Sequence, residues 1–282
     1  MIQLKSDAEI AKMRLAGLVV AEALGAVQEA VAPGVTLLEL DAVADQVIRS
    51  RGAVPSFLEY LPGVGYVPRG PGRNSFPATI CASVNDEIVH GIPGGRRLRS
   101  GDVVSVDCGA ILDGWHGDSA VTIPVGDVSD EAAQLLRVCE DALWAGIAAM
   151  QVDRRLRDIG GAIEDQVRGG GDYGIVAEYG GHGIGTEMHQ DPHVLNYRTR
   201  ARGPKLVPGM VLAVEPMINL GGPETELHDD QWTVTTADGS WSAHFEHTVA
   251  VTADGPWVLT ALDGGASRLS SLGVPTPATL AR

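Results

Sequence analysis

Two aspartates interrupt an apolar stretch of the chain at positions where a buried strand would carry aliphatic side chains. The stretch is 101–123, GDVVSVDCGAILDGWHGDSAVTI, and the two residues are Asp107 and Asp118. The pair Asp113-Gly114 divides it, which is typical of a two-residue hairpin turn. With that turn, the two aspartates become diagonal neighbours on one face of the hairpin. Two like charges in an apolar hairpin are costly unless a cation lies between them.

A second pair of carboxylates repeats this arrangement later in the chain. Residues 209–215, GMVLAVE, repeat the start of the first stretch, GDVVSVD, and end in Glu215. Residues 245–251, FEHTVAV, repeat its last part, GDSAVTI, and carry Glu246 in the place of the second aspartate. The repeat indicates an internal pseudo-two-fold with four acids converging at its centre. We expect superposition of the two halves to bring the aspartates onto the glutamates in order.

A glycine-rich segment, GGHGIG at 180–185, adds His182, and His189 follows it. A lone histidine is more often structural than a metal ligand, but this one accompanies four converging carboxylates. Imidazole and carboxylate ligands without a thiolate suit Mn, Fe, Co or Zn. Five ligands, of which two or more can bridge, suit two ions about 3.5–4 Å apart better than one.

The composition excludes several classes of partner. The chain of 282 residues carries 21 basic and 36 acidic side chains, a formal charge of −15, which argues against nucleic acid and anionic membrane surfaces. No apolar run approaches the roughly 20 residues of a membrane span, and the start, MIQLKSDAEI, is no signal peptide. Cys81, Cys108 and Cys139 contain no C-x-x-C pair, which disfavours disulfides and thiolate zinc sites. We therefore expect a cytoplasmic protein.

Helix signals occur in two pairs, one ahead of each pair of acidic strands. Ser6 and Glu9 form a capping box before a helical apolar stripe that runs to about residue 30. A second helix is predicted over 37–51. Ser129 is the N-cap of a third helix, and a fourth spans 154–168. Each half thus consists of two helices followed by strands, which predicts an α+β fold with an antiparallel sheet flanked by helices.

The domain organisation follows from the same pattern. We predict one catalytic domain over residues 1–265, with halves at 7–125 and 129–260. Residues 266–282 contain Ser, Pro and Thr without a period, and we predict a disordered tail there. The Gly/Pro-rich segment 61–76 is either a solvated loop or a rim over the site.

Six motifs together resemble those of type I methionine aminopeptidases. They are VNDEIVHGIP (84–93), SVDCG (105–109), GDSA (117–120), GHGIGTEMHQDP (181–192), VEPM (214–217) and FEHTV (245–249). The resemblance extends over about 7–260. It implies the pita-bread fold, an α/β sandwich of two pseudo-symmetric halves with a curved antiparallel sheet. It also implies a metal-dependent hydrolase that removes the initiator methionine from nascent proteins when the second residue is small.

The resemblance implies roles for the matching residues. Asp107 would chelate one divalent ion, His182 and Glu215 the other, and Asp118 and Glu246 would bridge them. His90 and His189 would contact the substrate on the two sides of the scissile bond, and Glu215 would relay a proton. The methionine pocket would contain Phe76, Cys81, Met188 and Trp232, and a monovalent cation would lie at Asn85 and Ser242.

Several of these residues have a plain structural interpretation as well. Cys81 is as well explained as a core cysteine as by the pocket, and Trp232 could serve packing alone. His116 shares the face of Asp118 but is better explained as a satisfied or supporting histidine than as a sixth ligand. The remaining histidines are interpreted as structural or exposed, namely His193, His228, His244 and His247.

Rival functions differ in what surrounds the ligand motifs. Proline-specific peptidases and creatine-degrading hydrolases usually carry a large extra N-terminal domain, whereas the first helix here begins near Asp7. Type II methionine aminopeptidases carry a long insertion between the ligand histidine and the next glutamate, but only 33 positions separate His182 from Glu215 (215 − 182). A non-enzymatic relative that binds peptides on the same fold would lose metal ligands, whereas this chain retains all five, together with His90 and His189.

The expected partners are nascent polypeptide N-termini, reached through a transient contact with the ribosome. We expect the chain to be a monomer.

Overall fold

The computed structural model describes residues 2–62, 65–66 and 74–277. The helices in these ranges are α1 (Asp7–Ala30), α2 (Leu37–Ser50), α3 (Asp130–Ala148), α4 (Leu156–Gly170) and α5 (Ala266–Ser271). The first four confirm the two predicted helix pairs. Their bounds agree with the predicted ones to within a few residues.

Capping side chains determine where three of these helices begin. At α1 the Ser6 side chain accepts from the Glu9 amide, and the Glu9 carboxylate accepts from the Ser6 amide. Thr36 and Glu39 form the same reciprocal pair at α2. At the start of α3, the Ser129 hydroxyl accepts a hydrogen bond from the Ala132 amide. Each cap satisfies amides that the first turn leaves without partners and is worth about 1 kcal/mol.

The long hairpin of the first half has the predicted register. It consists of β6 (Val103–Leu112) and β7 (Trp115–Pro124), in which Asp107 pairs with Ala120 and Gly109 with Asp118. Both turn residues have positive φ, 50° at Asp113 and 81° at the following glycine, as a type I′ turn requires. Two further strands pair with the free edge of β6, namely β1 (Val54–Pro55) and β4 (Ile80–Val84).

The second half contains a five-stranded sheet in the order β10, β9, β11, β16, β17. These strands are β9 (Gly181–Gly183), β10 (Gln190–Val194), β11 (Val211–Val214), β16 (His247–Thr252) and β17 (Gly255–Val258). Val214 pairs with His247 at the ends of β11 and β16, so Glu215 and Glu246 flank the same end of this strand pair. The two aspartates are instead diagonal across their hairpin, so the two strand pairs differ in register.

Three small sheets complete the described part of the fold. One contains β8 (Gly174–Ile175), β12 (Met217–Asn219) and β15 (Ser242–His244), and another contains β5 (Glu87–Val89), β13 (Thr225–Leu227) and β14 (Val234–Thr236). The shortest pairs β2 (Tyr60–Leu61) with β3 (Gly65–Tyr66).

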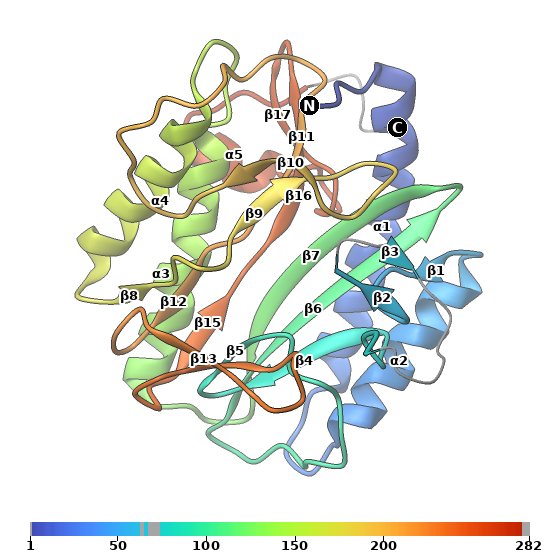
Figure 1. The fold of residues 1–282 in the computed structure, drawn as a ribbon, viewed down its shortest axis with the longest axis vertical. Coiled ribbons are helices and arrows are strands. Elements are labelled where there is room, and N and C mark those ends of the chain that lie inside the picture. The colour runs from blue at the N-terminus through green and yellow to red at the C-terminus, as the bar shows by residue number, and fades with distance from the viewer. Residues whose placement is uncertain (1, 63–64, 67–73, 278–282) are drawn as a thin grey trace.

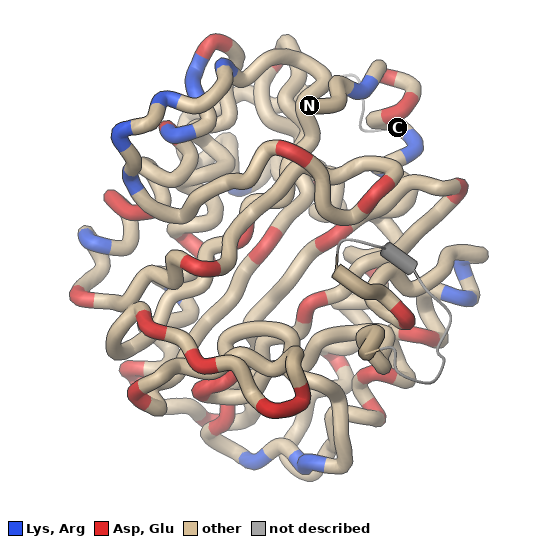
Figure 2. The backbone as a smooth tube through the Cα atoms, viewed as in Figure 1, with Lys and Arg blue, Asp and Glu red and all other residues tan. Residues whose placement is uncertain are grey.

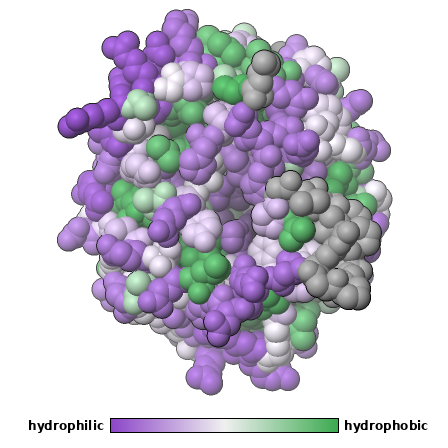
Figure 3. All heavy atoms as spheres, in the orientation of Figure 1, coloured by the Kyte–Doolittle hydropathy of each residue, from purple (hydrophilic) through white to green (hydrophobic). Residues whose placement is uncertain are grey.

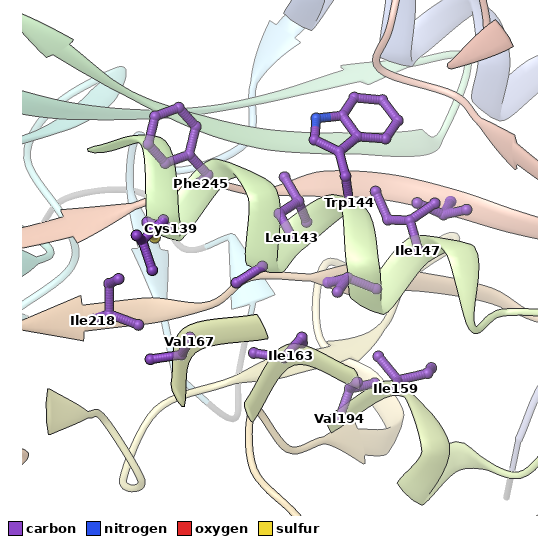
Figure 4. Close-up of a cluster of buried hydrophobic side chains, with 14 of the residues drawn as sticks. Cys139, Leu143, Trp144, Ile147, Ile159, Ile163, Val167, Val194, Ile218 and Phe245 are labelled. Atoms are coloured by element: carbon purple, nitrogen blue, oxygen red, sulfur yellow. The ribbon is translucent and has the colours of Figure 1, made fainter. Parts of the chain in front are cut away.

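The helix pairs cover the strands of their own halves. α1 packs against β6 and β7, whereas α3 packs against β11, β12 and β15, and Figure 1 shows the two pairs on opposite sides of the central strands. Figure 4 shows the core between α3, α4 and the strands, which includes Cys139, Leu143, Trp144, Ile147, Ile159, Ile163, Val167, Val194, Ile218 and Phe245. Each large side chain buried there contributes about 1.5–3 kcal/mol. The two helix pairs thus support the strands that carry the four carboxylates.

The prediction of a disordered tail over 266–282 is wrong for most of its length. Residues 266–271 form α5, and the side chain of Leu269 is fully buried in the core beneath α3. The chain continues as described structure to residue 277, while 278–282 lie outside the described residues. The sequence shows no helical period here because a single apolar residue anchors so short a helix.

Across the described residues, every helix is too short or too polar to cross a membrane. Figure 3 shows that hydrophilic side chains predominate on one face, with hydrophobic ones scattered among them.

A close approach between α1 and the second half depends on glycine. A Cβ at Gly17 would lie 2.3 Å from the carbonyl oxygen of Leu259, whereas a Cβ at Gly25 in the same helix would meet nothing within 4 Å. We expect Gly17→Ala to lower the free energy of unfolding by about 1–3 kcal/mol because backbone must move apart. Gly25→Ala should raise it by about 0.4–1 kcal/mol. Urea denaturation of both variants measures this, and equal effects would contradict the close contact.

Candidate metal centre and substrate pocket

Four carboxylates converge between the two halves. Asp107 lies on β6 and Asp118 on β7, while Glu215 follows β11 and Glu246 precedes β16. All four line one cavity of about 360 Å³. Figure 2 shows acidic positions along the central strands. The convergence expected from the two repeated strand motifs is therefore present.

Hydrogen bonds across the two halves hold the carboxylate-bearing strands together. The amide of Glu246 donates to the Ala120 carbonyl oxygen at 2.9 Å, and the Ala120 amide donates back at 3.3 Å. The Thr248 hydroxyl donates to the carbonyl oxygen of Asp118 at 2.7 Å and accepts from the Asp118 amide at 3.1 Å. Asp118 and Glu246 are therefore each anchored by backbone or hydroxyl groups of the opposite half.

Three of these carboxylate oxygens have no hydrogen-bond donor among the described residues. Within the described part of the chain, Asp107 Oδ1, Asp118 Oδ1 and Glu246 Oε1 are buried without a hydrogen-bond partner. Burial raises the pKa of Asp107 to about 7, and burial together with neighbouring acids raises the pKa values of Asp118 and Glu246 well above their ordinary range. Buried polar atoms normally have partners. A cluster of unpartnered anionic oxygens therefore fits divalent cations, which would supply the missing positive charge.

His182 is oriented to act as a nitrogen ligand. Its Nδ1 lies 3.0 Å from the Gly183 carbonyl oxygen, which can only accept, so Nδ1 carries the hydrogen. Its Nε2 then has a free lone pair and lies 3.6 Å from Glu215 Oε1 and 3.9 Å from Asp118 Oδ2. A hydrogen-bonded Nδ1–H opposite a free Nε2 is the usual arrangement of a metal-binding histidine.

Among the described residues, two groups of side chains could each hold a metal ion. Asp118, His182 and Glu246 form one group, and Glu215, His244 and Glu246 form the other, with ligand atoms within 4.8 Å of one another in each. Glu246 belongs to both groups. Asp107 belongs to neither, although it lines the same cavity.

His244 was expected to be structural or exposed, and it is a buried residue beside a predicted ligand. Its side chain is buried, and its Nε2 lies 3.6 Å from Glu215 Oε2 without a hydrogen-bond partner among the described residues. Burial opposes the ionisation of Glu215, but His244, His182 and His189 together hold its pKa below the ordinary value. The one sequence signal was that His244 stands two residues before Glu246, the spacing that puts strand residues on one face.

His90 and His189, the predicted substrate contacts, lie on the same cavity. Desolvation in the cavity lowers the pKa of His90 to about 4, and desolvation together with the nearby His182 lowers the pKa of His189 to about 3, so both rings are neutral near pH 7. His90 has a φ of 60° and packs edge-on to the rings of Tyr179 and Trp232. The His189 ring lies 4.3 Å from that of His182 between centroids. Neutral rings can donate or accept hydrogen bonds to a peptide group.

An apolar cluster forms one wall of this cavity. It contains Phe57, Phe76, Ala78, Cys81, Met188 and Trp232. The structure thus brings together all four predicted pocket residues, and Cys81 faces the cavity as well as the core. Burial and the nearby acids raise the pKa of its thiol well above the ordinary value, so it stays neutral. Sequence reasoning missed Phe57, Tyr60 and Pro62, which also line the cavity, because they match none of the six motifs.

The segment 61–76 is only partly covered by the structure. Its first residues border the site, since Pro62 lines the cavity. Its last residue, Phe76, packs against Trp232 with ring centroids 5.2 Å apart. Residues 63–64 and 67–73 lie outside the described residues. Of the two alternatives, a solvated loop or a rim, the positions of both described ends favour the rim.

Asn85 and Ser242, the expected monovalent-cation residues, lie next to each other. The Ser242 amide donates to the Asn85 carbonyl oxygen at 2.8 Å. The Asn85 side-chain oxygen accepts from the Val103 amide, and the Ser242 hydroxyl donates to the Ile218 carbonyl oxygen. Each side chain thus makes a hydrogen bond within the protein, and its oxygen keeps a free lone pair.

Three of the four other histidines have identifiable hydrogen-bond partners. His116 Nδ1 lies 3.1 Å from the Ser56 hydroxyl, which agrees with a satisfied, supporting histidine. His247 is hydrogen-bonded to the hydroxyls of Ser119 and Thr260, and His228 to that of Thr235. His193 is exposed on β10. None of these four belongs to a ligand group found among the described residues.

Comparison with known proteins places these motifs in a family. The sequence profile of metallopeptidase family M24 matches residues 11–253. "Methionine aminopeptidase 1" of Mycobacterium tuberculosis (strain CDC 1551 / Oshkosh) is 52% identical over 262 residues, which cover 91% of this chain and 94% of that one. "Methionine aminopeptidase" of Clostridium perfringens (strain 13 / Type A) is 45% identical, with 92% and 99% covered. The crystal structure of methionine aminopeptidase from Rickettsia prowazekii has a TM-score of 0.86 at 40% identity, covering 93% and 100%.

Proposed function

The chain belongs to metallopeptidase family M24 and, within it, to the methionine aminopeptidases, and on this premise we propose how it selects and cleaves its substrate. It has the pita-bread fold and removes the N-terminal methionine of proteins. We propose that it does so on nascent chains whose second residue is small. The supporting observation is that the unpartnered buried carboxylates and an apolar wall share one cavity.

We propose that the site holds two divalent ions. Asp107 would bind one, His182 and Glu215 the other, and Asp118 and Glu246 would bridge them. The membership of Glu246 in both ligand groups supports its bridging role. Four carboxylates balance the charge of two divalent cations, and the mixed oxygen and nitrogen set suits Mn, Fe, Co or Zn. When bound, such ions polarise a carbonyl and acidify a water molecule to near-neutral pKa.

The protein's own residues carry the proton transfers and position the substrate. Water attacks the carbonyl carbon of the first peptide bond, and the Glu215 carboxylate takes the water proton. Glu215 then passes that proton to the departing nitrogen as the carbon–nitrogen bond breaks, which releases methionine and a shortened chain with a free amine. His189 donates a hydrogen bond to the carbonyl oxygen as negative charge develops on it. His90 contacts the substrate on the other side of this bond.

The apolar wall explains the choice of methionine. A thioether side chain is apolar and polarizable and makes favourable contacts with aromatic rings. Phe76 and Trp232 supply such rings, and the neutral Cys81 thiol adds a small polarizable surface. Burial of a methionine side chain there is worth about 1.5–3 kcal/mol. The first residue is therefore selected by burial in this pocket.

The second residue should be selected by space near the scissile bond. A peptide series that varies only this residue should show cleavage of Met-Gly, Met-Ala and Met-Ser, with Met-Leu, Met-Lys and Met-Trp slower by about 10²-fold or more. A bulky side chain beside His90 and His189 would displace the carbonyl, and about 1 Å of misplacement can cost this factor. Release of methionine measures the rates.

Two controls make this series decisive. A Leu-Ala peptide tests the pocket, and a formylated Met-Ala peptide tests the need for a free amine that can bind at the metal centre. Both should be cleaved poorly. Equal rates for Met-Gly and Met-Trp, or faster release of leucine than of methionine, would instead indicate a general aminopeptidase.

The chain would act as a monomer that meets its substrates through transient contact with the ribosome. A monovalent cation near Asn85 and Ser242 would bind to oxygens of these residues, because the Ser242 hydroxyl donates its hydrogen and the Asn85 side-chain oxygen accepts one hydrogen bond, which leaves each a lone pair.

A further inference from the structure

A tyrosine hydroxyl contacts the histidine that is proposed to stabilise the reacting carbonyl. The Tyr60 hydroxyl lies 2.7 Å from His189 Nδ1, and the two ring centroids are 5.4 Å apart. Tyr60 is held in place by its backbone, since its amide donates to the Phe57 carbonyl oxygen and its carbonyl accepts from the Phe76 amide. It lines the cavity beside the carboxylates. The Tyr60 hydroxyl thus contacts a residue of the catalytic cavity directly.

The direction of this hydrogen bond follows from the acidity of the two groups. A neutral imidazole nitrogen is a far stronger base than a phenol oxygen, and a phenol is a stronger acid than a neutral imidazole N–H. The favoured arrangement is therefore O–H of Tyr60 donating to Nδ1 of His189. Burial, with the charges of Asp118 and Glu187, raises the pKa of Tyr60, so the hydroxyl keeps its proton.

We propose that Tyr60 is a positioning residue that fixes the tautomer of His189, so that Nδ1 accepts and Nε2 carries the hydrogen. This inference rests on the proposed role of His189 as a donor to the scissile carbonyl. With its lone pair occupied at Nδ1, His189 can present only an N–H at Nε2. The substrate oxygen then meets a donor without any change of tautomer during the reaction, which avoids a reorganisation cost.

The neighbouring histidine shows the opposite arrangement. His182 Nδ1 donates to the Gly183 carbonyl oxygen, which leaves a lone pair on Nε2 for the metal centre. Each histidine therefore has one partner at Nδ1, a carbonyl for His182 and a hydroxyl for His189. When the partner at Nδ1 only accepts a hydrogen bond, Nε2 keeps a lone pair and can bind a metal. When the partner at Nδ1 donates, Nε2 carries the hydrogen and acts as a hydrogen-bond donor. Two rings only 4.3 Å apart are thereby assigned different tasks.

The test is Tyr60→Phe, which removes only the hydroxyl and keeps the ring in the pocket wall. We expect kcat for Met-Ala-Ser to fall about 10- to 100-fold, the range for partners that orient functional groups, while KM changes by less than about threefold. Metal content and thermal stability should match the wild type. The matched control is Tyr173→Phe, since Tyr173 lies after α4 on the core of the second half and should tolerate the change.

A measurement without substrate separates this inference from the proposed function. Nitrogen-15 NMR of the histidine rings, on protein loaded with diamagnetic Zn²⁺, reports which ring nitrogen carries the hydrogen. The His189 signals are identified by their absence in His189→Ala. The wild type should show the Nε2–H form alone, and Tyr60→Phe should show a mixture of both forms.

Different results would contradict the role of Tyr60 and the proposed function. An Nδ1–H form of His189 in the wild type, an unchanged spectrum in Tyr60→Phe, or wild-type kcat in that variant would overturn the inference. A wild type that fails to cleave Met-Ala-Ser, yet shows the tautomer change in Tyr60→Phe, would instead overturn the proposed function and leave the assigned hydrogen bond intact.

Discussion

Replacing Asp118 by Asn should lower kcat/KM by about 10³-fold or more, equivalent to ~4 kcal/mol of transition-state stabilisation. The variant keeps the size of the side chain and one oxygen but loses the charge that would bridge two cations. Bound metal should fall from two ions per chain toward one or none, measured by elemental analysis after dialysis. Glu246→Gln should have the same effect because it removes the other bridge.

The fold should persist in both variants. The Asp118 backbone remains bonded to the Thr248 hydroxyl, and the Glu246 backbone to Ala120. Removing a buried negative charge among like charges also relieves repulsion, so thermal stability without metal should not fall. Asp113→Asn is the matched control on the same hairpin, since this exposed turn residue has a φ of 50° that Asn tolerates. Wild-type turnover in Asp118→Asn would refute the two-ion site.

Replacing His189 by Ala should lower kcat by about 10²–10³-fold, the cost of one lost donor to a developing oxyanion. KM should change little, because the proposed hydrogen bond strengthens only in the transition state. His189 belongs to neither ligand group among the described residues, so metal content should equal that of the wild type. Steady-state kinetics with Met-Ala-Ser and metal analysis of the same preparations test both statements.

His193→Ala is the control for that experiment. His193 lies four residues further on, exposed on β10, and its loss should leave kcat within about twofold, as for other surface changes. If His189→Ala instead released metal, His189 would be a ligand and its proposed role would be wrong. If kcat stayed at the wild-type level, the carbonyl would need another donor.

The sequence alone determined the features that depend on local period and local bonding. Side chains alternate along strands, so the Asp-Gly turn was enough to predict the register of β6 with β7 and the common face of Asp107 and Asp118. Capping boxes involve residues three apart, and they located the start of α1. The repeated carboxylate motifs and His182 then indicated one metal centre, because few apolar strands tolerate acids without a cation.

Only the tertiary structure decided the contacts between segments that are distant in the chain. Tyr60 meets His189 across 129 positions, and no period or spacing relates them. His244 faces Glu215 because β12 and β15 pair, which strand alternation alone does not specify. Residues 266–271 form a helix because Leu269 packs into the core beneath α3. These contacts are stabilised by packing between segments that are distant in the chain. The composition or the hydrophobic period of a single segment therefore does not predict them.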